Sequence, residues 1–240
     1  MVFVSPPQWI PQPVTTAAYI QLFTFIPFLQ QIGNTVLVAV SVTIGELICC
    51  SLAGYAFARI AFPARDTLFL AYLGTLMIPS QVTLIPTYIL MKYLGWIDSY
   101  YGLIVPFLFG SAFGTFLLRQ FFMTIPVDLE DAAFIDGANY FQVYRIVMLP
   151  LVKPALATLG LFTFIGQWNN FLWPLIITNS QSRMTITVSV AVLSQDTLSA
   201  TFNWPTLMAG ATVSVIPLLV VFAFTQRYFV EGVVLTGLKA

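Results

Sequence analysis

Long apolar runs, separated by short polar stretches, make up most of the 240-residue chain. A helix needs about 20 apolar residues to cross the hydrocarbon core of a bilayer. Five segments reach that length, and they cover residues 31–60, 67–93, 101–123, 146–177 and 207–230. The pattern predicts an all-α, polytopic membrane protein with five spans in this chain. Residues 1–240 are expected to form a single transmembrane domain, with the helical bundle over residues 31–230.

Prolines interrupt four of the five predicted spans. They are Pro79 and Pro86 in the second, Pro106 in the third, Pro150 and Pro154 at the start of the fourth, and Pro217 in the last. Each proline removes a backbone donor and bends a helix. A bundle tolerates such bends because neighbouring helices satisfy the freed carbonyl groups.

Composition narrows the function classes. Hydrophobic residues make up 59% of the chain and charged residues 8%, whereas soluble domains carry roughly 25% charged residues. The net charge of zero argues against nucleic acid as a partner. Histidine is absent, which removes the commonest general base and metal ligand. We therefore expect no catalytic residues and no metal site, and we interpret the adjacent Cys49 and Cys50 as packing residues.

Lysine and arginine are distributed unevenly between the two sides of the predicted bundle. One side holds Arg59, Arg65, Arg119, Arg145, Lys153, Arg227 and Lys239, and the other holds Lys92 and Arg183. Because Lys and Arg mark cytoplasmic loops, the tail 231–240 is predicted to be cytoplasmic and the segment 1–30 external. The N-terminus does not resemble a signal peptide, so nothing in this chain would carry residues 1–30 across the membrane. We therefore expect a further transmembrane helix before Met1.

The polar stretch 128–154 is unusual in so apolar a chain. Asp128 is placed to cap a short helix, with Asp131 three residues later as the analogue of a capping box. Gly137 is placed to end that helix in the left-handed conformation. Asn139 then predicts a second N-cap, with Gln142 three residues on. The stretch is interpreted as a helix, a glycine elbow and a second helix.

The first of these helices has a face that could receive another protein. Leu129, Ala132, Ala133 and Asp136 share this face by their three-and-four spacing. The two alanines have almost no side chain, so a partner surface could approach closely. An amphipathic connector lying on the lipid headgroups is the alternative, and the residues alone do not choose between the two.

The segment EDAAFIDGANYFQVYRIVMLPLVKPAL resembles the EAA-loop signature of permease subunits in binding-protein-dependent ABC importers. The matching positions are Asp131, where Glu is usual, and Ala132, Ala133, Asp136, Gly137, Ala138, Leu149, Pro150 and Pro154. The segments 55–59, 116–122, 168–171 and 226–232 resemble the carbohydrate-uptake branch, and are similar to the smaller maltose-type permease subunit.

The resemblance implies a transport subunit of the bacterial or archaeal cytoplasmic (inner) membrane. Expected partners are a second, related permease subunit, two nucleotide-binding ATPase subunits, an extracytoplasmic solute-binding protein and membrane lipid. The family carries six spans, which agrees with a missing first helix. No cofactor is expected in this chain, since ATP and Mg bind the ATPase. The helix 128–137 would be the coupling helix within an EAA coupling loop, 128–154.

Several polar residues at membrane depth are candidates for the solute pathway. They are Glu46 in the first span, Gln81 and Thr83 beside a proline of the second, and Trp168, Asn169 and Asn170 in the outer half of the fourth. Amides and a flat ring suit the hydroxyl groups of a sugar or related polyol. Glu46 could equally be a protonated packing residue, and the cluster 168–170 could be an interfacial aromatic belt.

Other functions remain as alternatives at this point. An ion-coupled secondary carrier could use Glu46, but the inverted repeats common in such carriers are not evident. A permease for another solute, such as glycerol 3-phosphate, is a closer alternative. The polar segment 179–203 is expected to face outward, as a landing surface for the binding protein or as an inert loop.

Overall fold

The computed structural model describes residues 15–195 and 204–237, without the side chains of residues 25, 195 and 225–237. Its described residues contain helices and no strand, so the all-α prediction is confirmed. The helices are α1 (Ala17–Phe25), α2 (Phe28–Arg59), α3 (Arg65–Gly74), α4 (Ser80–Tyr93), α5 (Tyr100–Leu108), α6 (Ala112–Thr124), α7 (Asp128–Ile135), α8 (Tyr140–Gln142), α9 (Leu149–Leu151), α10 (Lys153–Trp168), α11 (Leu172–Ile177), α12 (Ile186–Gln195) and α13 (Trp204–Gly237). A 3-10 turn, η1 (Thr75–Met77), follows α3, and a π-helical segment, η2 (Val143–Met148), joins α8 to α9.

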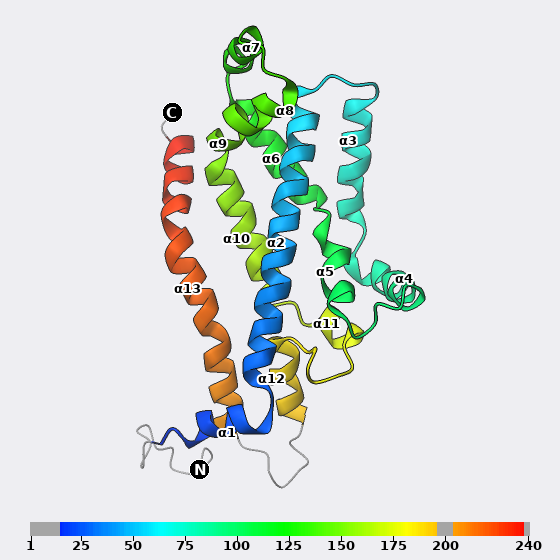
Figure 1. Ribbon diagram of the computed structural model, residues 1–240, viewed down its shortest axis with the longest axis vertical. Helices are drawn as coiled ribbons and strands as arrows, with labels where there is room; N and C mark the ends of the chain where they lie inside the picture. Colours follow the sequence, from blue (N-terminus) through cyan, green and yellow to red (C-terminus); the bar gives the residue numbers. More distant parts are fainter. Residues whose placement is uncertain (1–14, 196–203, 238–240) are drawn as a thin grey trace.

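The bundle is elongated, with α2 and α13 running along most of its length (Figure 1). The short helix α7 stands beyond one end, which we call the α7 end, and α13 finishes near that end. Helices α1 and α12 lie at the opposite end, which we call the α1 end. The loop 128–154 and the last described residues of the chain therefore share one end, as the distribution of Lys and Arg predicts. Lys239, at the extreme C-terminus, lies outside the described residues.

Among the residues that the structure describes, three helical stretches are long and apolar enough to cross a membrane, and two bent pairs bring the possible number of spans to five. The three are Phe28–Arg59, Tyr100–Thr124 and Trp204–Phe224. The last continues as helix to Gly237, so the predicted tail 231–240 begins within α13. The third span is broken between α5 and α6, where Gly110 has a φ of +93°.

The second predicted span, 67–93, is not one rod. Its halves, Arg65–Met77 and Ser80–Tyr93, are bent by 96° around the break before α4. Pro79 is extended at that break, with a ψ of 134°, and has no N–H to continue the helix. As a result α4 projects sideways from the bundle (Figure 1).

The fourth predicted span, 146–177, is also corrected at both ends. Tyr140–Leu151 lies at 78° to Lys153–Trp168, so the helix along the bundle begins at Lys153. The bend follows Pro150 and precedes Pro154, as the two prolines predict. At the other end α10 stops at Trp168, and α11 is a separate helix of 6 residues.

The core consists of apolar clusters at each end and between α2, α5 and α11. The cluster nearest α7 gathers Cys50, Tyr55, Leu118, Phe122, Val143, Tyr144, Met148, Val152, Ala155 and Leu159. Helices α2 and α6 approach closely there, since a Cβ at Gly54 would lie 3.0 Å from the backbone nitrogen of Arg119. Small residues allow such approach between membrane helices.

Candidate functional site

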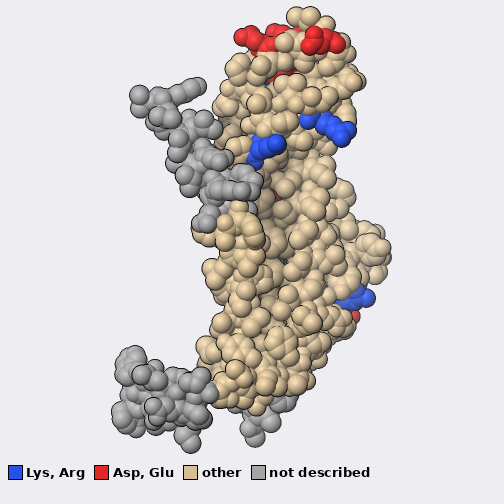
Figure 2. Space-filling model, turned by 60° about the vertical axis from the view of Figure 1, so that its left-hand side comes forward, with Lys and Arg blue, Asp and Glu red and all other residues tan. Residues whose placement is uncertain are grey.

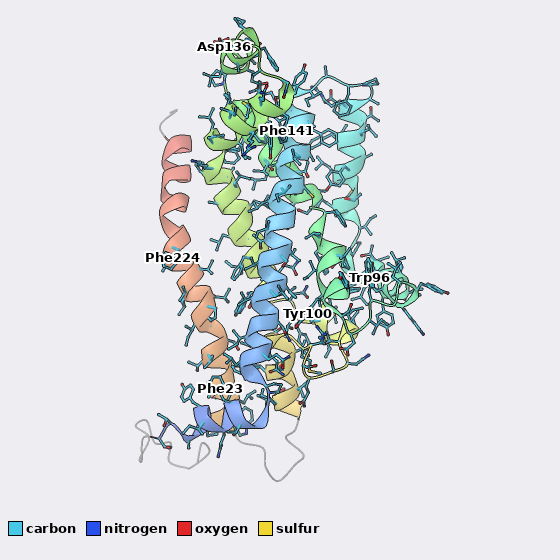
Figure 3. The ribbon with its side chains drawn as sticks, in the orientation of Figure 1. Phe23, Trp96, Tyr100, Asp136, Phe141 and Phe224 are labelled. Atoms are coloured by element: carbon cyan, nitrogen blue, oxygen red, sulfur yellow. The ribbon has the colours of Figure 1, made fainter. Side chains whose placement is uncertain are left out.

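Helix α7 divides into an outward and an inward face. Asp131, Ala132 and Asp136 are exposed, and Asp136 lies at the tip of the molecule (Figure 3). Ala133 and Ala138 instead pack against the apolar cluster nearest α7. The predicted face is therefore corrected at Ala133, which turns toward the bundle.

The start of α7 also differs from the prediction. The helix begins at Asp128 with Val127 as its N-cap, and no side chain accepts a hydrogen bond from its first turn. Asp128 and Asp131 are thus helical residues rather than a cap and its partner. Their negative charges still lie at the helix N-terminus, where the helix dipole favours them.

The elbow after α7 has the predicted geometry. Gly137 has a φ of +85°, in the left-handed region. Asn139 then caps the next helix: its side chain accepts from the N–H of Gln142 at 3.0 Å, and the Gln142 side chain accepts from the N–H of Asn139 at 2.8 Å. This is the reciprocal capping box that the spacing predicts.

A buried ion pair links α7 to α2, and sequence reasoning missed it. The Glu130 Oε1 atom lies 2.9 Å from the Nε atom of Arg59, with 6% and 10% of the two side chains exposed. The Nη2 group of Arg59 also donates to the backbone oxygens of Phe122, at 2.7 Å, and Ile125 at the end of α6. The available signal was that Glu130 shares its helical face with Ala133 and Phe134, which are apolar.

Charged side chains gather at the α7 end. On the face shown in Figure 2, acidic groups cover this end, basic groups lie just beneath them, and the surface below is largely uncharged. Asp128, Asp131 and Asp136 are the exposed acids of the α7 segment. The α7 end is therefore the part of the bundle best suited to water and to a polar partner.

Three of the proposed pathway residues come together in one pocket. Gln81 and Thr83 from α4 and Asn170 before α11 line a cavity of about 290 Å³, together with Ser80, Leu84, Thr87, Pro106, Phe107, Leu172 and Trp173. The amide nitrogen of Gln81 and the side-chain amide of Asn170 bond no other described residue. They are free to bind a solute hydroxyl.

Trp173 and Phe107 supply the aromatic surface of this pocket, a role predicted for Trp168. The indole N–H of Trp173 donates to the Gly102 carbonyl at 2.9 Å, and its ring meets Phe107 edge-on, with 5.9 Å between centroids. The ring is thus held by α5. Trp173 lies beyond the break after α10, so helical spacing from Trp168 could not place it.

Trp168 is a core residue, and its assignment to the pathway is corrected. Only 1% of it is exposed, and its indole N–H donates to the Ser214 carbonyl of α13 at 3.1 Å. The neighbouring Asn169 is exposed, and its amide bonds the Ile165 carbonyl of its own helix at 2.9 Å. Asn169 also does not line the pocket.

Glu46 is buried where the third span breaks. Its carboxylate accepts from the hydroxyl of Ser111, which in turn caps α6 by accepting from the Gly114 N–H at 3.0 Å. Glu46 does not line the pocket with Gln81 and Asn170. These contacts favour the packing alternative, in which the carboxyl group fixes the helix break.

The segment 179–203 is tied down over its first part and includes the helix α12, while residues 196–203 lie outside the described residues. Asp98 Oδ1 accepts from the Asn179 N–H at 3.0 Å, and from the Ser180 N–H and hydroxyl at 3.1 and 3.0 Å. Burial acts to raise the pKa of Asp98, but these hydrogen bonds and the Arg183 charge outweigh it, so the pKa is lowered.

Asn34 of α2 secures the same segment from the other side. Its amide donates to the carbonyls of Ser182 and Met184, both at 2.9 Å, and its oxygen accepts from the Tyr100 hydroxyl at 2.7 Å. Residues 179–184 are therefore held against α2 and α5 by hydrogen bonds, and these contacts do not decide between a landing surface for a binding protein and an inert loop.

The arrangement provides a pocket and a projecting helix. Among the described residues, no group of three or more Cys, Asp or Glu side chains could hold a metal ion.

Solved structures share this fold. The permease chain of a bacterial ABC transporter involved in the import of the acidic polysaccharide alginate superposes with a TM-score of 0.81 at 26% identity, covering 92% of this chain and 81% of that chain. The MetNI methionine ABC transporter, in an inward-facing conformation, gives a TM-score of 0.62 at 13% identity over 89% of this chain and 97% of that chain.

Curated relatives are more similar in sequence. The sn-glycerol-3-phosphate transport system permease protein UgpE of Brucella abortus is 39% identical over 203 residues, which span 85% of this chain and 71% of the relative. The protein of the same name from Yersinia pestis is 39% identical over 208 residues, or 87% of this chain and 73% of the relative.

A family-level comparison covers most of the chain. Residues 50–234 match the family described as binding-protein-dependent transport system inner membrane component. The matched range includes α7, the elbow and both prolines of the resemblance first noted in the sequence. This chain belongs to that family, and is a membrane-embedded permease subunit of an ABC importer.

Proposed function

We propose that this permease forms half of the pathway for a hydroxylated solute, a sugar or related polyol, and that α7 couples the pathway to an ATP-hydrolysing subunit. The observation that carries the coupling role is α7 itself, a short helix standing beyond the bundle with an exposed face and an anchored one. Family membership removes the need for an ion-coupled carrier using Glu46. ATP and Mg bind the partner, and this chain contributes no catalytic residue.

In this proposal the residues of the loop have separate tasks. Asp131, Ala132 and Asp136 form the surface that meets the ATPase, while Ala133 and Ala138 seat the helix on the bundle. Gly137 sets the angle between α7 and the next helix. The bend between Pro150 and Pro154 then redirects the chain into α10.

The proposed orientation places the α7 end and the C-terminus in the cytoplasm. The excess of Lys and Arg at this end supports that orientation. The α1 end, with its ordered segment around Asn179, would then face the extracytoplasmic solute-binding protein. One of the solved relatives is described as a transporter in complex with an alginate-pentasaccharide-bound periplasmic protein.

A second permease subunit would complete the pathway beside α4. This helix leaves the bundle with large apolar side chains exposed, among them Val82, Ile85, Ile89 and Tyr93. Such surface is suited to a membrane partner or to lipid. A partner on α4 would also enclose the pocket, since α4 forms one wall of it.

The pocket indicates the solute class. Its described polar groups are the hydroxyls and amides of Ser80, Gln81, Thr83, Thr87 and Asn170, with no charged side chain. The relatives carry names for sn-glycerol 3-phosphate and for alginate, both hydroxylated and anionic. This pocket suits the hydroxyl groups, and a phosphate or carboxylate of the solute would be bound elsewhere in the importer.

The coupling role is tested by cross-linking. In the complete importer, with Cys49 and Cys50 replaced by alanine, Ile135→Cys places a thiol on an α7 position that is 86% exposed. We expect a short bifunctional reagent to join it to the ATPase subunit. Tyr93→Cys, equally exposed on α4, is the control and should give no such product. Cross-linking from Tyr93→Cys alone would contradict the proposal.

The pathway role is tested by two adjacent amides. Asn170→Leu removes a free amide from the pocket, and should raise the KM for uptake about tenfold, the typical cost of one lost polar contact. Asn169→Leu changes an amide outside the pocket and should leave KM near the wild-type value. Uptake of radiolabelled sn-glycerol 3-phosphate and of maltose by proteoliposomes provides both measurements. Equal effects of the two variants would refute the assignment.

A further inference from the structure

Helix α7 has few attachments to the rest of the bundle. It has 8 residues, and a helix of this length is marginal alone in water. Its close backbone packing is on η2, the π-helical segment that leads toward α10, while α2 and α6 do not approach it as closely. The Arg59 side chain reaches across this space to Glu130.

Arg59 holds three helices at one point. It is the last residue of α2, it donates to two backbone oxygens at the end of α6, and it pairs with Glu130 of α7. The planar guanidinium group presents several donors in a fixed arrangement. Its hydrogen bonds to the two backbone oxygens of α6 are directional. The contact with Glu130 is a buried ion pair in which Nε and Oε1 make no hydrogen bond.

The surroundings keep the pair out of water. Tyr55, one turn before Arg59, packs its ring against Phe122 and Tyr144, with centroids 5.7 and 5.4 Å away. Behind it the hydroxyls of Ser51 and Tyr144 are 2.7 Å apart, which ties α2 to η2. The pair therefore stands at the edge of a packed aromatic cluster and not in a mobile surface loop.

The electrostatics argue against a purely stabilising role. Burial raises the pKa of the Glu130 carboxyl above its ordinary value; Arg59 acts against this rise, and the neighbouring Asp131 adds to it. The net rise means that the attraction of Arg59 does not fully offset the cost of burying the charge. Buried pairs of this kind are weak evidence for stability and are often replaceable by apolar residues. A role in holding α7 in position relative to α2 and α6 is the better explanation of the pair.

We infer that Arg59 and Glu130 form the joint through which a displacement of α7 reaches α2 and α6, in addition to the route through η2 to α10. This inference rests on the proposed coupling role of α7. Without the joint, α7 could tilt on η2 while α2 and α6 stayed in place. ATP would then be hydrolysed with less solute moved. Both residues are positioning residues, since neither touches solute or nucleotide.

The first test measures whether α7 and α2 move as one body. Nitroxide labels are placed on Ile135 of α7 and Ile48 of α2, which are 86% and 54% exposed, in the complete importer with and without ATP. The wild type should give one narrow distance distribution in both states. Glu130→Gln keeps the shape and removes the charge, and should broaden the distribution or make it change with ATP. Arg65→Gln, at an exposed pair with Asp66, is the matched control.

The second test separates coupling from folding. Arg59→Met with Glu130→Met removes both charges, so no unpaired charge remains and assembly should survive. We expect the double variant to hydrolyse ATP in the assembled importer, but to move about tenfold less solute per ATP, the effect of losing a charged contact. Radiolabelled sn-glycerol 3-phosphate is the probe, or maltose where the wild type takes up that sugar instead.

The outcomes distinguish this inference from the proposal beneath it. If the double variant matches the wild type in both distance distribution and solute moved per ATP, the joint is refuted; a cross-link from Ile135→Cys to the ATPase would then leave the coupling role intact. If Ile135→Cys, with Arg59 and Glu130 unchanged, gives no such cross-link, the coupling role fails and the joint fails with it. Broadened distances together with lowered transport per ATP support the joint.

Discussion

Replacing Gly137 tests the elbow that sets the direction of α7. The residue has a φ of +85°, which L-amino acids with a side chain rarely adopt. A Cβ built at this position meets no atom within 4 Å. The cost of Gly137→Ala therefore comes from backbone conformation and not from a steric clash.

The size of the effect follows from that conformation. A residue other than glycine pays about 1–2 kcal/mol in the left-handed region, and this changes an equilibrium roughly 5- to 30-fold. Because the surrounding space is open, Gly137→Leu should cost about as much as Gly137→Ala. Gly137→Asn should cost least, since Asn enters this region more readily than other residues.

The assay compares this series in proteoliposomes that contain the complete importer. Uptake and ATP hydrolysis stimulated by the loaded binding protein should both fall for Ala and Leu, while insertion of the protein stays normal. Asn should retain most of the activity. Normal uptake and normal stimulation in Gly137→Leu would refute the elbow, and a steady decline with side-chain size would show that sterics control the site.

Three further predictions concern other parts of the fold. Gly102→Ala would place a Cβ 2.3 Å from the Trp96 carbonyl oxygen, so it should lower the Tm by an amount typical of about 1–3 kcal/mol of overpacking. Gly166→Ala is the control, because a Cβ there meets no atom within 4 Å, and it should leave the Tm unchanged. Equal Tm shifts in the two variants would contradict the packing. Trp168→Phe loses the hydrogen bond to the Ser214 carbonyl, which should cost about 0.6–2 kcal/mol of stability and leave the KM for uptake unchanged. A changed KM with an unchanged Tm would indicate that Trp168 does line the solute pathway. Asp98→Asn tests the lowered pKa of the Asp98 carboxyl. The ionised carboxyl stabilises the fold at pH values above its ordinary pKa of 3.8, and this contribution is lost as the pH falls through the lower pKa of the folded state. The Tm difference between wild type and variant should therefore be largest near neutral pH and shrink below pH 3.8; a difference that grows on acidification would contradict the sign.

Features controlled by local rules could be predicted from the sequence. The left-handed glycine at 137, the capping box of Asn139 and Gln142, and the bend between the two prolines each depend on a few neighbouring residues. The all-α, polytopic character could be predicted because span length is a property of the bilayer, whereas the number of spans in the described residues is three, or up to five if each bent pair is one span.

Features controlled by tertiary contacts could not. The prolines of the second span predicted a bend, but not a 96° turn that carries α4 out of the bundle. Trp168 looked like a sugar-binding ring until the partner of its indole N–H, Ser214 of α13, was known. Glu130 looked like one more acid of a polar loop, because its partner Arg59 lies far away in the sequence.

The central claim is that the exposed face of α7 is the contact with the ATP-hydrolysing subunit. A reconstruction of the complete importer by electron cryomicroscopy, with ATP bound, measures this directly. We predict that Ala132, Ile135 and Asp136 lie in a groove of the ATPase, on the cytoplasmic side of the membrane. An α7 helix lying against lipid, or facing the solute-binding protein, would contradict the account.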